Sequence, residues 1–418
     1  METLKRIFRT PELRNSILFI LFAVTVFRVA AHITVPGIDA SGLSALLEGN
    51  QFLGLLNVFS GGTLNNFSIV ALGVAPYITS SIIFQLLGMI LPSVEEMQKE
   101  EQGRAKINRW TRMATVPLAL LQSYGLIRII EQQPLGISLQ GIDLATAMLS
   151  MAAGTIFLMW LGELISERKV GNGMSIMIFA GIIAGLPSVV MQMAATYTRA
   201  DLLDVALFVL LSIVTIVGVV VVSEGQRNIP VQYARGLRGS AGKIQSSLPL
   251  RINIGGMIPI IFALSIIVLP PLVAQFFTTA RTQVVQDIAT GTIALFSNNL
   301  FYGIAYFTLV FAFTFFYASI VFRPEQVAEN LQKQGGFIPG VRPGEQTTKY
   351  LGWVVNRLLL SGAVFLGIIA ILPIIVQAIT GNQNLVVGGS SVIIVVSVVV
   401  DIVKQVQSQL TMRSYDIG

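Results

Sequence analysis

Residues 254–277 read IGGMIPIIFALSIIVLPPLVAQFF. This stretch contains no charged residue, and it is longer than the roughly 20 residues that a helix needs to cross a hydrocarbon layer about 30 Å thick. In lipid, only a helix or a closed barrel satisfies its own backbone hydrogen bonds, and this run is too long and too evenly apolar for a barrel strand. The stretch therefore predicts a membrane-spanning helix.

The same character recurs along the whole chain. Of its 418 residues, 54% are hydrophobic and 11% are charged, whereas about 25% are charged in an ordinary soluble domain. This composition predicts an all-α integral membrane protein. We expect about ten transmembrane helices, at residues 15–33, 74–92, 112–131, 144–165, 173–193, 204–222, 254–277, 299–321, 355–378 and 389–407.

The first of these runs imitates a cleavable signal peptide. Basic residues from Lys5 to Arg14 precede an apolar segment, Ile17 to Phe27, and small residues follow at Ala30 and Ala31. Such a pattern is typical of secretory signals. Because the apolar character resumes beyond Arg28 and nine further runs follow, we interpret this segment as a retained first span.

The distribution of basic residues predicts the orientation. If the N-terminus is cytoplasmic, all but four of the 27 Lys and Arg residues fall on cytoplasmic segments, the exceptions being Arg28, Arg128, Arg199 and Arg281. This bias follows the positive-inside rule and places both termini in the cytoplasm. It also accounts for the net charge of +6 without a DNA partner. The two longest basic loops, 223–253 and 322–354, are the expected docking surface for a soluble partner.

Two segments of the chain resemble each other. Gly73-Val-Ala-Pro76 opens the second span, which ends at Pro92, and Gly256-Met-Ile-Pro259 opens the seventh, for which we expect an end at Pro270 and Pro271. A shift of five spans reverses the orientation of a helix. This similarity therefore favours an inverted repeat of five helices plus five, with an N-terminal half at 1–200 and a C-terminal half at 201–418.

Most catalytic chemistry is excluded by what the chain lacks. It has no cysteine and a single histidine, His32, which removes thiol nucleophiles and most metal sites. No phosphate-binding loop is present, since Gly242-Lys243 is followed by Ile244,. We expect no catalytic residue, no metal and no cofactor. A small-solute secondary transporter that uses hydroxyls and backbone remains an alternative, because such a carrier needs no buried charge.

Isoleucines recur at helical spacing on four of the predicted spans. The segment 34–73, predicted to lie outside the cytoplasm, contains a short apolar stretch that is interrupted by Gly and Asn residues. By spacing alone, these isoleucines are ordinary packing or lipid-facing positions. This interrupted stretch, from Phe59 to Val70, is too short and too polar to span, and we expect it to fold back into the protein.

The sequence resembles the SecY family of protein-translocation channels. The resemblance is carried by five motifs in family order: Phe59-Ser-Gly-Gly62 with Ala71-Leu-Gly-Val-Ala-Pro-Tyr-Ile-Thr-Ser-Ser-Ile-Ile-Phe-Gln-Leu-Leu87, Gly171-Asn-Gly-Met-Ser-Ile176, Arg227-Asn-Ile-Pro-Val-Gln-Tyr-Ala234, Leu248-Pro-Leu-Arg-Ile-Asn253 and Gly340-Val-Arg-Pro-Gly-Glu345. It covers all ten predicted spans. It implies two five-helix halves around an hourglass pore that opens sideways to lipid between the second and seventh helices.

The resemblance also assigns roles to individual residues. The pore ring falls on Ile78, Ile82, Ile178, Ile182, Ile261 and Ile394. A re-entrant plug helix falls at about 56–70, with Phe59, Gly61, Gly62, Leu64, Asn65, Asn66 and Phe67. Weak helix propensity and little strongly apolar surface should make this plug easy to displace. Contacts with the SecA motor or the ribosome fall on Arg235, Arg238, Lys243, Arg251 and Arg342, although the first three are more widely spaced than in many relatives.

The function implied is passive. Such a channel moves unfolded, signal-sequence-bearing polypeptides across the cytoplasmic (inner) membrane and releases hydrophobic segments into the lipid, with energy from SecA or from translation. SecE is the implied partner subunit, and SecG is a further one.

Overall fold

The structure is a computed structural model that describes residues 10–36, 57, 60–131, 139–196, 202–233, 246–278, 280, 282–380 and 384–416. Helices make up most of this part of the chain. The α-helices are α2 (Pro11–Ala30), α5 (Ala75–Ile90), α6 (Pro92–Lys99), α7 (Glu101–Glu131), α8 (Ile142–Glu167), α9 (Gly173–Thr196), α10 (Leu202–Glu224), α11 (Ile258–Phe277), α12 (Gln283–Ser297), α13 (Asn299–Val321), α14 (Pro324–Lys333), α15 (Glu345–Thr380) and α16 (Asn384–Asp416).

Each of the ten predicted spans overlaps one of these helices. Within the described residues, seven helices are long and apolar enough to cross a membrane, and the bent pair α5 and α6, with 114° between its two parts, raises the number to eight. The remaining two predicted spans lie on α9 and α10, whose described apolar stretches are shorter, Gly173–Gly185 and Val209–Glu224. The chain is thus a multi-pass helical membrane protein, and the count of ten crossings stays a prediction.

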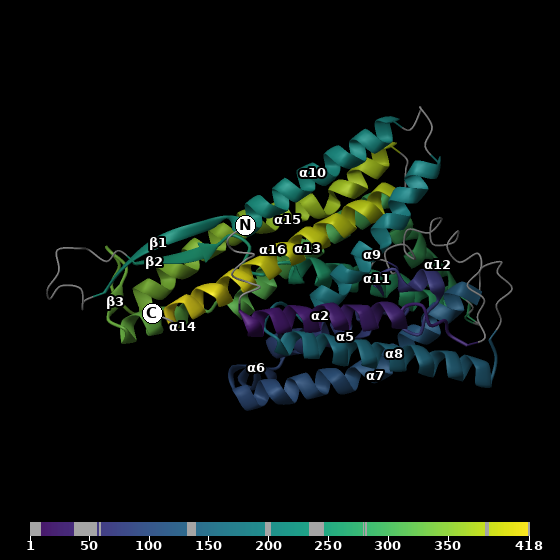
Figure 1. The fold of residues 1–418 in the computed structure, drawn as a ribbon, viewed down its shortest axis with the longest axis horizontal. Coiled ribbons are helices and arrows are strands. Elements are labelled where there is room, and N and C mark those ends of the chain that lie inside the picture. Colours follow the sequence, from purple (N-terminus) through teal and green to yellow (C-terminus); the bar gives the residue numbers. More distant parts are fainter. Residues whose placement is uncertain are drawn as a thin grey trace.

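The long helices form two groups (Figure 1). In one group α5, α7 and α8 pack together and α2 packs against α8; in the other, α10, α13, α15 and α16 pack together. Helix α11 packs on α13 and α9 packs on α8, so these helices extend the two groups. The groups meet where α11 contacts α5 and α7, and where α16 contacts α9. A single cluster of buried apolar side chains runs through both groups and includes Phe27, Leu158, Phe262 and Leu366.

Helices α5 and α11 begin in the same way. Gly73 and Gly256 both have positive φ angles, 57° and 59°, a conformation that favours glycine. In each case a proline, Pro76 or Pro259, is the second residue of the helix that follows, a position where the missing N–H costs nothing. Helix α11 continues through Pro270 and Pro271 to Phe277, so the predicted bound at residue 277 is confirmed and the expected end at these two prolines is wrong. Neighbouring helices make such internal prolines tolerable in a spanning helix.

The two long basic loops form one small sheet. Strand β1 (Gln226–Tyr233) pairs antiparallel with β2 (Ser246–Arg251), and β3 (Gly336–Phe337) pairs with the far end of β1 through Gln232 and Tyr233. Beneath the sheet, Ile229 and Leu250 pack with Ile338 of the second loop and Leu351 of α15. The sequence predicted these loops only as a docking surface; the strands were not predicted.

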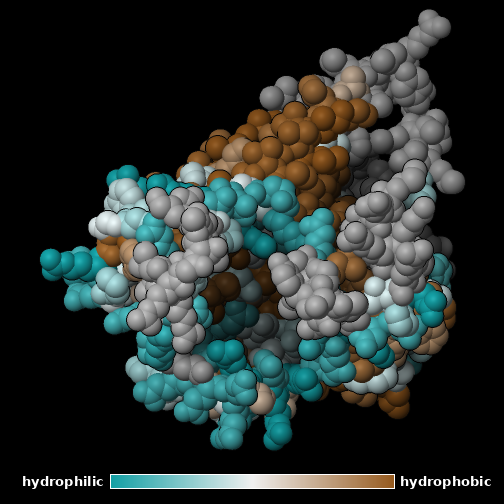
Figure 2. Space-filling view, turned by 60° about the vertical axis from the view of Figure 1, so that its left-hand side comes forward, coloured by the Kyte–Doolittle hydropathy of each residue, from teal (hydrophilic) through white to brown (hydrophobic). Residues whose placement is uncertain are grey.

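Polar and apolar surfaces are segregated. Seen from the end of the molecule that carries the sheet, Figure 2 shows a polar rim around a central hollow, with broad apolar surface on the helices behind it. The exposed apolar residues include Val209, Leu210, Ile213 and Val217 of α10. Such contiguous apolar surface is typical of a lipid-facing helix.

Candidate functional site

The six isoleucines expected to form a pore ring come together at the junction of the two helix groups. Ile78 and Ile82 lie on α5, Ile178 and Ile182 on α9, and Ile261 and Ile394 on α11 and α16. All six are buried and belong to the same apolar cluster. The arrangement brings together side chains that are more than 300 residues apart in sequence. Their role as a ring remains a prediction.

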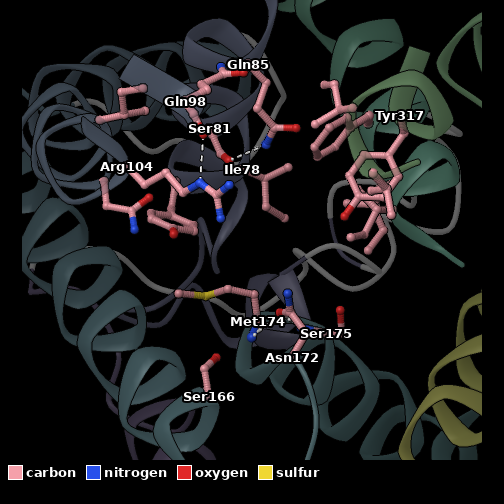
Figure 3. A pocket seen from close by; sticks show the side chains of 18 of the residues that line it. Ile78, Ser81, Gln85, Gln98, Arg104, Ser166, Asn172, Met174, Ser175 and Tyr317 are labelled. Carbon is pink, nitrogen blue, oxygen red and sulfur yellow. Dashed lines mark hydrogen bonds between the residues drawn. The ribbon is translucent and has the colours of Figure 1, made fainter. Parts of the chain in front are cut away.

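A cavity of about 630 Å³ opens beside this cluster. Its walls come from both helix groups: α5, α7, α8 and α9 on one side, and α11, α13 and α14 on the other. Ile78, Ile178 and Ile261 lie on its surface. Figure 3 shows Ile78 between Gln85 and Met174, with Tyr317 on the opposite wall. The cavity therefore leads from the polar, sheet-bearing end of the molecule to the isoleucines.

Several polar residues of this cavity form hydrogen bonds or ion pairs. Arg112 Nε lies 2.6 Å from Glu163 Oε1, and Arg104 Nε donates to the carbonyl oxygen of Gln98 at 2.7 Å. On α5, Gln85 Nε2 donates to Ser81 Oγ at 2.9 Å. The cavity thus has a polar, hydrogen-bonding wall that gives way to apolar side chains. The sequence gives no sign of the pairing of Glu163 with Arg112, because the two residues lie on different helices, α8 and α7.

Asn172 also belongs to this wall, and it sets the start of α9. Its side-chain Oδ1 accepts hydrogen bonds from the backbone N–H groups of Met174 (3.0 Å) and Ser175 (3.2 Å). This is an N-cap interaction, which satisfies donors that the first turn of a helix leaves free. It fixes the beginning of the helix that carries Ile178 and Ile182.

The predicted plug touches α9 directly beside the isoleucines. The backbones of Gly61 and Gly181 approach so closely that a Cβ atom on Gly181 would lie 2.1 Å from the Cα of Gly61. Arg28 of α2 donates from Nη1 to the carbonyl oxygen of Gly61 at 3.2 Å. Gly181 precedes Ile182, so the segment lies against the predicted ring. The sequence singled out Gly61 and Gly62 but gave no sign of Gly181 or Arg28 as their partners.

From Gly61 onward the form of this segment differs from the expectation of an easily displaced helix, whereas Asn57 and Ser60 before it are helical. Between Gly61 and Val74 the backbone forms one 3-10 turn, Thr63–Asn66, followed by further turns. Leu64 and Phe67 are buried in a second apolar cluster with Ile127 of α7 and Met151 of α8. Full burial of a Leu or Phe side chain stabilises by about 1.5–3 kcal/mol. The expectation that this segment has little strongly apolar surface is therefore wrong. Asn65 in the 3-10 turn is exposed. Phe59 lies outside the described residues.

The residues expected to bind a partner lie on or beside the sheet where they are described. Arg251 is exposed at the end of β2, opposite Gln226. Arg342 is exposed in the turn between β3 and α15, and its carbonyl oxygen accepts from Thr347 Oγ1 at 2.9 Å. Arg235, Arg238 and Lys243 lie outside the described residues. No group of three or more His, Asp or Glu residues that could hold a metal occurs in the part of the chain that the structure describes.

Comparison with known proteins identifies the family. The family model SecY matches residues 68–403. The chain belongs to the SecY family. It is 41% identical to the protein translocase subunit SecY of Streptomyces galbus over 435 aligned residues, with 98% of each chain covered. The SecY subunit of Corynebacterium glutamicum is 39% identical, with 100% of this chain and 99% of the relative covered.

Solved structures share the fold. A structure described as that of a protein conducting channel matches with a TM-score of 0.65 at 17% identity, covering 93% of this chain and 91% of the other. Sec61 in a canine ribosome-channel complex from the endoplasmic reticulum matches with a TM-score of 0.62 at 16% identity and the same coverage. The chain therefore has the SecY and Sec61 channel fold. As a member of this family of channels, the chain is not an enzyme.

Replacing Gly181 with Val should push the Gly61 segment away from α9. A side chain there cannot be accommodated without movement, and overpacking of this kind costs about 1–3 kcal/mol. Because the chain has no cysteine, Ser60→Cys provides a buried reporter. Its labelling by a maleimide should be about tenfold faster in the Gly181→Val background, since 1.4 kcal/mol corresponds to a factor of ten. Gly185→Val, on the same helix with open space around it, is the control; equal labelling in both backgrounds would contradict the contact.

Proposed function

We propose that the chain is the pore-forming subunit of a protein-conducting channel. It lets unfolded secretory polypeptides pass through the cytoplasmic membrane and releases hydrophobic segments sideways into the lipid. One observation carries the proposal: six isoleucines from four helices gather in one buried cluster at the end of a polar cavity, with Gly61 packed against the neighbouring Gly181. The protein supplies the path, and the driving energy comes from a partner.

The chemistry of the isoleucines suits this role. Flexible apolar side chains close around a passing chain of any sequence because they form no directional bonds. A hydrophobic constriction also expels water, which opposes ion leakage. The small-solute transporter considered from the sequence is not favoured, since the chain's family is that of protein translocase subunits.

The sideways exit is proposed between α5 and α11, the second and seventh spans, and α7, which packs on α5, also contacts α11. Tyr124 and Phe276 stack there with ring centroids 5.6 Å apart and 16° between their planes. A Cβ atom on Gly125 would lie 2.8 Å from Phe276 Cζ, so the phenylalanine ring packs directly over the backbone of α7. The guanidinium carbon of Arg128 lies over the Tyr124 ring, 5.1 Å from the ring centroid. Separation of the two helix groups must break this aromatic contact.

The sheet is the proposed docking surface for the driving partner. Arg251 and Arg342 are exposed on or beside it, and arginine binds carboxylate or phosphate in a bidentate manner. That chemistry serves both an acidic protein surface and ribosomal RNA. The proposed partners are the SecA motor and the ribosome, with SecE and SecG as membrane subunits. Both termini and the sheet would then face the cytoplasm, as the basic residues predict.

The decisive test is crosslinking to a stalled secretory chain. Photoreactive residues at positions 82 and 261 should crosslink to a translocation intermediate in native membranes, because both side chains line the proposed path. The crosslinks should disappear when the signal sequence is deleted. Position 83, exposed on the same helix as position 82, is the matched control. Absence of crosslinks at 82 and 261 in an inserted, folded protein would refute the channel function.

The seal should weaken when Ile82 becomes polar. Ile82→Asn places an amide in the apolar constriction and favours its wetting. We expect raised ion conductance in planar bilayers and passage of precursors with defective signal sequences. Ile83→Asn changes the adjacent exposed residue and should do neither. Unchanged conductance and signal selection in Ile82→Asn would show that this residue lies outside the pore.

Removal of the aromatic contact should ease sideways release. Aromatic pairs contribute about 0.5–1.5 kcal/mol beyond their area of contact, so Phe276→Ala should lower the cost of separating α7 from α11. Segments of marginal hydrophobicity should then enter the lipid more efficiently, as measured by glycosylation or protease mapping of model substrates. Phe277→Ala removes the next ring, which is half exposed, and should leave the insertion threshold unchanged. An equal effect of both variants would count against an exit at this contact.

A further inference from the structure

We propose that α12 (Gln283–Ser297) is an interfacial helix: it lies along the surface of the bilayer and inserts one apolar face among the lipids. This binding site for lipid adjoins the end of α11. The inference goes beyond the channel function and depends only on the chain being embedded in a membrane. It is carried by the three distinct faces of α12 and by the position of the helix between two spans.

One face of α12 packs on the protein. Ala289 is buried, and Ile293 and Phe296 are half-buried. Phe296 meets Phe301 of α13 edge to face, with ring centroids 5.2 Å apart. These residues are three or four positions apart and so lie on one side of a helix. The helix is therefore held against α11 and α13 along this side.

A second face is apolar but exposed. Val284 and Ile288 are each 65% exposed, and Leu295 is 53% exposed. The spacing of four and seven residues places all three on a single stripe, which lies beside the packed face and not beneath it. Three large aliphatic side chains on one stripe lose stabilisation if they face water.

The third face is polar. Gln283, Gln286, Asp287 and Thr290 are exposed, and they lie on the remaining side of the helix by the same spacing rule. A helix with a protein face, an apolar face and a polar face has the distribution expected at a boundary between hydrocarbon and water. A helix fully in water would not need the second face, and one fully in lipid would not carry the third.

The neighbouring spans fix the depth of α12. Both α11 and α13 are long and apolar enough to cross the membrane, so α11 must end at the membrane face where α13 begins. With 15 residues, α12 is too short to cross between them. Asn298 alone separates α12 from α13, and its Oδ1 caps α13 by accepting from the backbone N–H of Leu300 at 2.9 Å. Helix α12 thus lies at the level where the spans leave the lipid.

The apolar stripe also continues onto the membrane surface of the protein. Leu300 and Ile304, in the first two turns of α13, are both strongly exposed. A spanning helix at this depth has lipid as its surroundings, so the stripe of α12 adjoins a lipid-facing surface. This continuity favours lipid over a soluble protein as the occupant.

The charges of α12 specify which lipid property it recognises. Asp287 is the only charged residue in the helix, and no Lys or Arg lies on it. Binding must therefore depend on burial of apolar side chains and not on attraction to anionic headgroups. Neutral phosphatidylcholine should bind the helix as well as anionic lipid does.

The test measures the depth of single side chains in the full-length, reconstituted protein. Since the chain has no cysteine, a fluorophore can be attached to one new cysteine at a time: Val284→Cys, Ile288→Cys or Leu295→Cys on the apolar stripe, and Gln286→Cys or Thr290→Cys on the polar face. In phosphatidylcholine vesicles, a nitroxide carried on the lipid just below the headgroup should quench the three stripe positions about threefold more than the two polar ones. Aqueous iodide should show the opposite preference.

Two results would overturn the proposal. Equal, strong quenching by iodide at all five positions would place the stripe in water. Protection of the stripe from both quenchers would mean that a protein surface, of a partner or of a second copy, covers it. Replacing one third of the phosphatidylcholine with phosphatidylglycerol should leave the pattern unchanged, and a pattern that appears only with the anionic lipid would refute apolar insertion. None of these readouts involves translocation, so the channel function stands or falls separately.

Discussion

Backbone hydrogen bonding in lipid is the constraint on which the rest of this structure depends. A bilayer offers no partner for an unpaired N–H or C=O group, so irregular backbone at membrane depth must be satisfied by the protein itself. The segment after Gly61 meets this requirement without a long helix. Ile69 donates its N–H to Ile33 at 2.9 Å, Phe67 accepts from Val35 at 3.0 Å, and the Thr63 hydroxyl contacts the carbonyl oxygen of Val70 at 2.9 Å.

This pairing divides the segment into two parts with different attachments. Around Phe67, burial against α7 and α8 and pairing with residues 33–35 tie the chain firmly to the first helix group. Around Gly61, the described contacts with the helices include the close approach to Gly181 of α9 and one hydrogen bond from Arg28 of α2. Motion of the Gly61 end therefore costs much less than removal of the whole segment, since neither Leu64 nor Phe67 needs to leave its site.

The fold class could be read from the sequence, because length and apolar character alone require helices in lipid. Each predicted span overlaps a helix, although α7 begins at Glu101 where residue 112 was predicted and α15 begins at Glu345 where residue 355 was predicted. The sheet was not, since β3 pairs with β1 across about 100 residues and two loops that look independent. The packed, apolar and polar faces of α12 are present in the sequence as a pattern. That pattern indicates an interfacial helix only once α11 and α13 are known to be the spans on either side of it.

The candidate site was predictable only in part, and for a physical reason. Isoleucines at helical spacing look the same in a pore, in a core and in lipid; only the resemblance to a family separated Ile82 from the exposed Ile83. Arg28 and Gly181 carry no such mark, because their importance comes from a contact with Gly61 on another element. The pairing of Arg112 with Glu163 was hidden in the same way, one residue being on α7 and the other on α8.

The sheet connects directly to the helices of the site. Strand β2 ends at Arg251, seven residues before the start of α11, while β3 is followed by α15 after a short turn. Because β1 holds both edge strands, a load applied to the sheet is shared between α11 and α15. Its antiparallel hydrogen bonds run across the strands, so a pull along the strands would shear all of them together, whereas a sideways pull would open them one after another. The direction in which a partner pulls would then decide whether the sheet transmits force to the helices or peels apart.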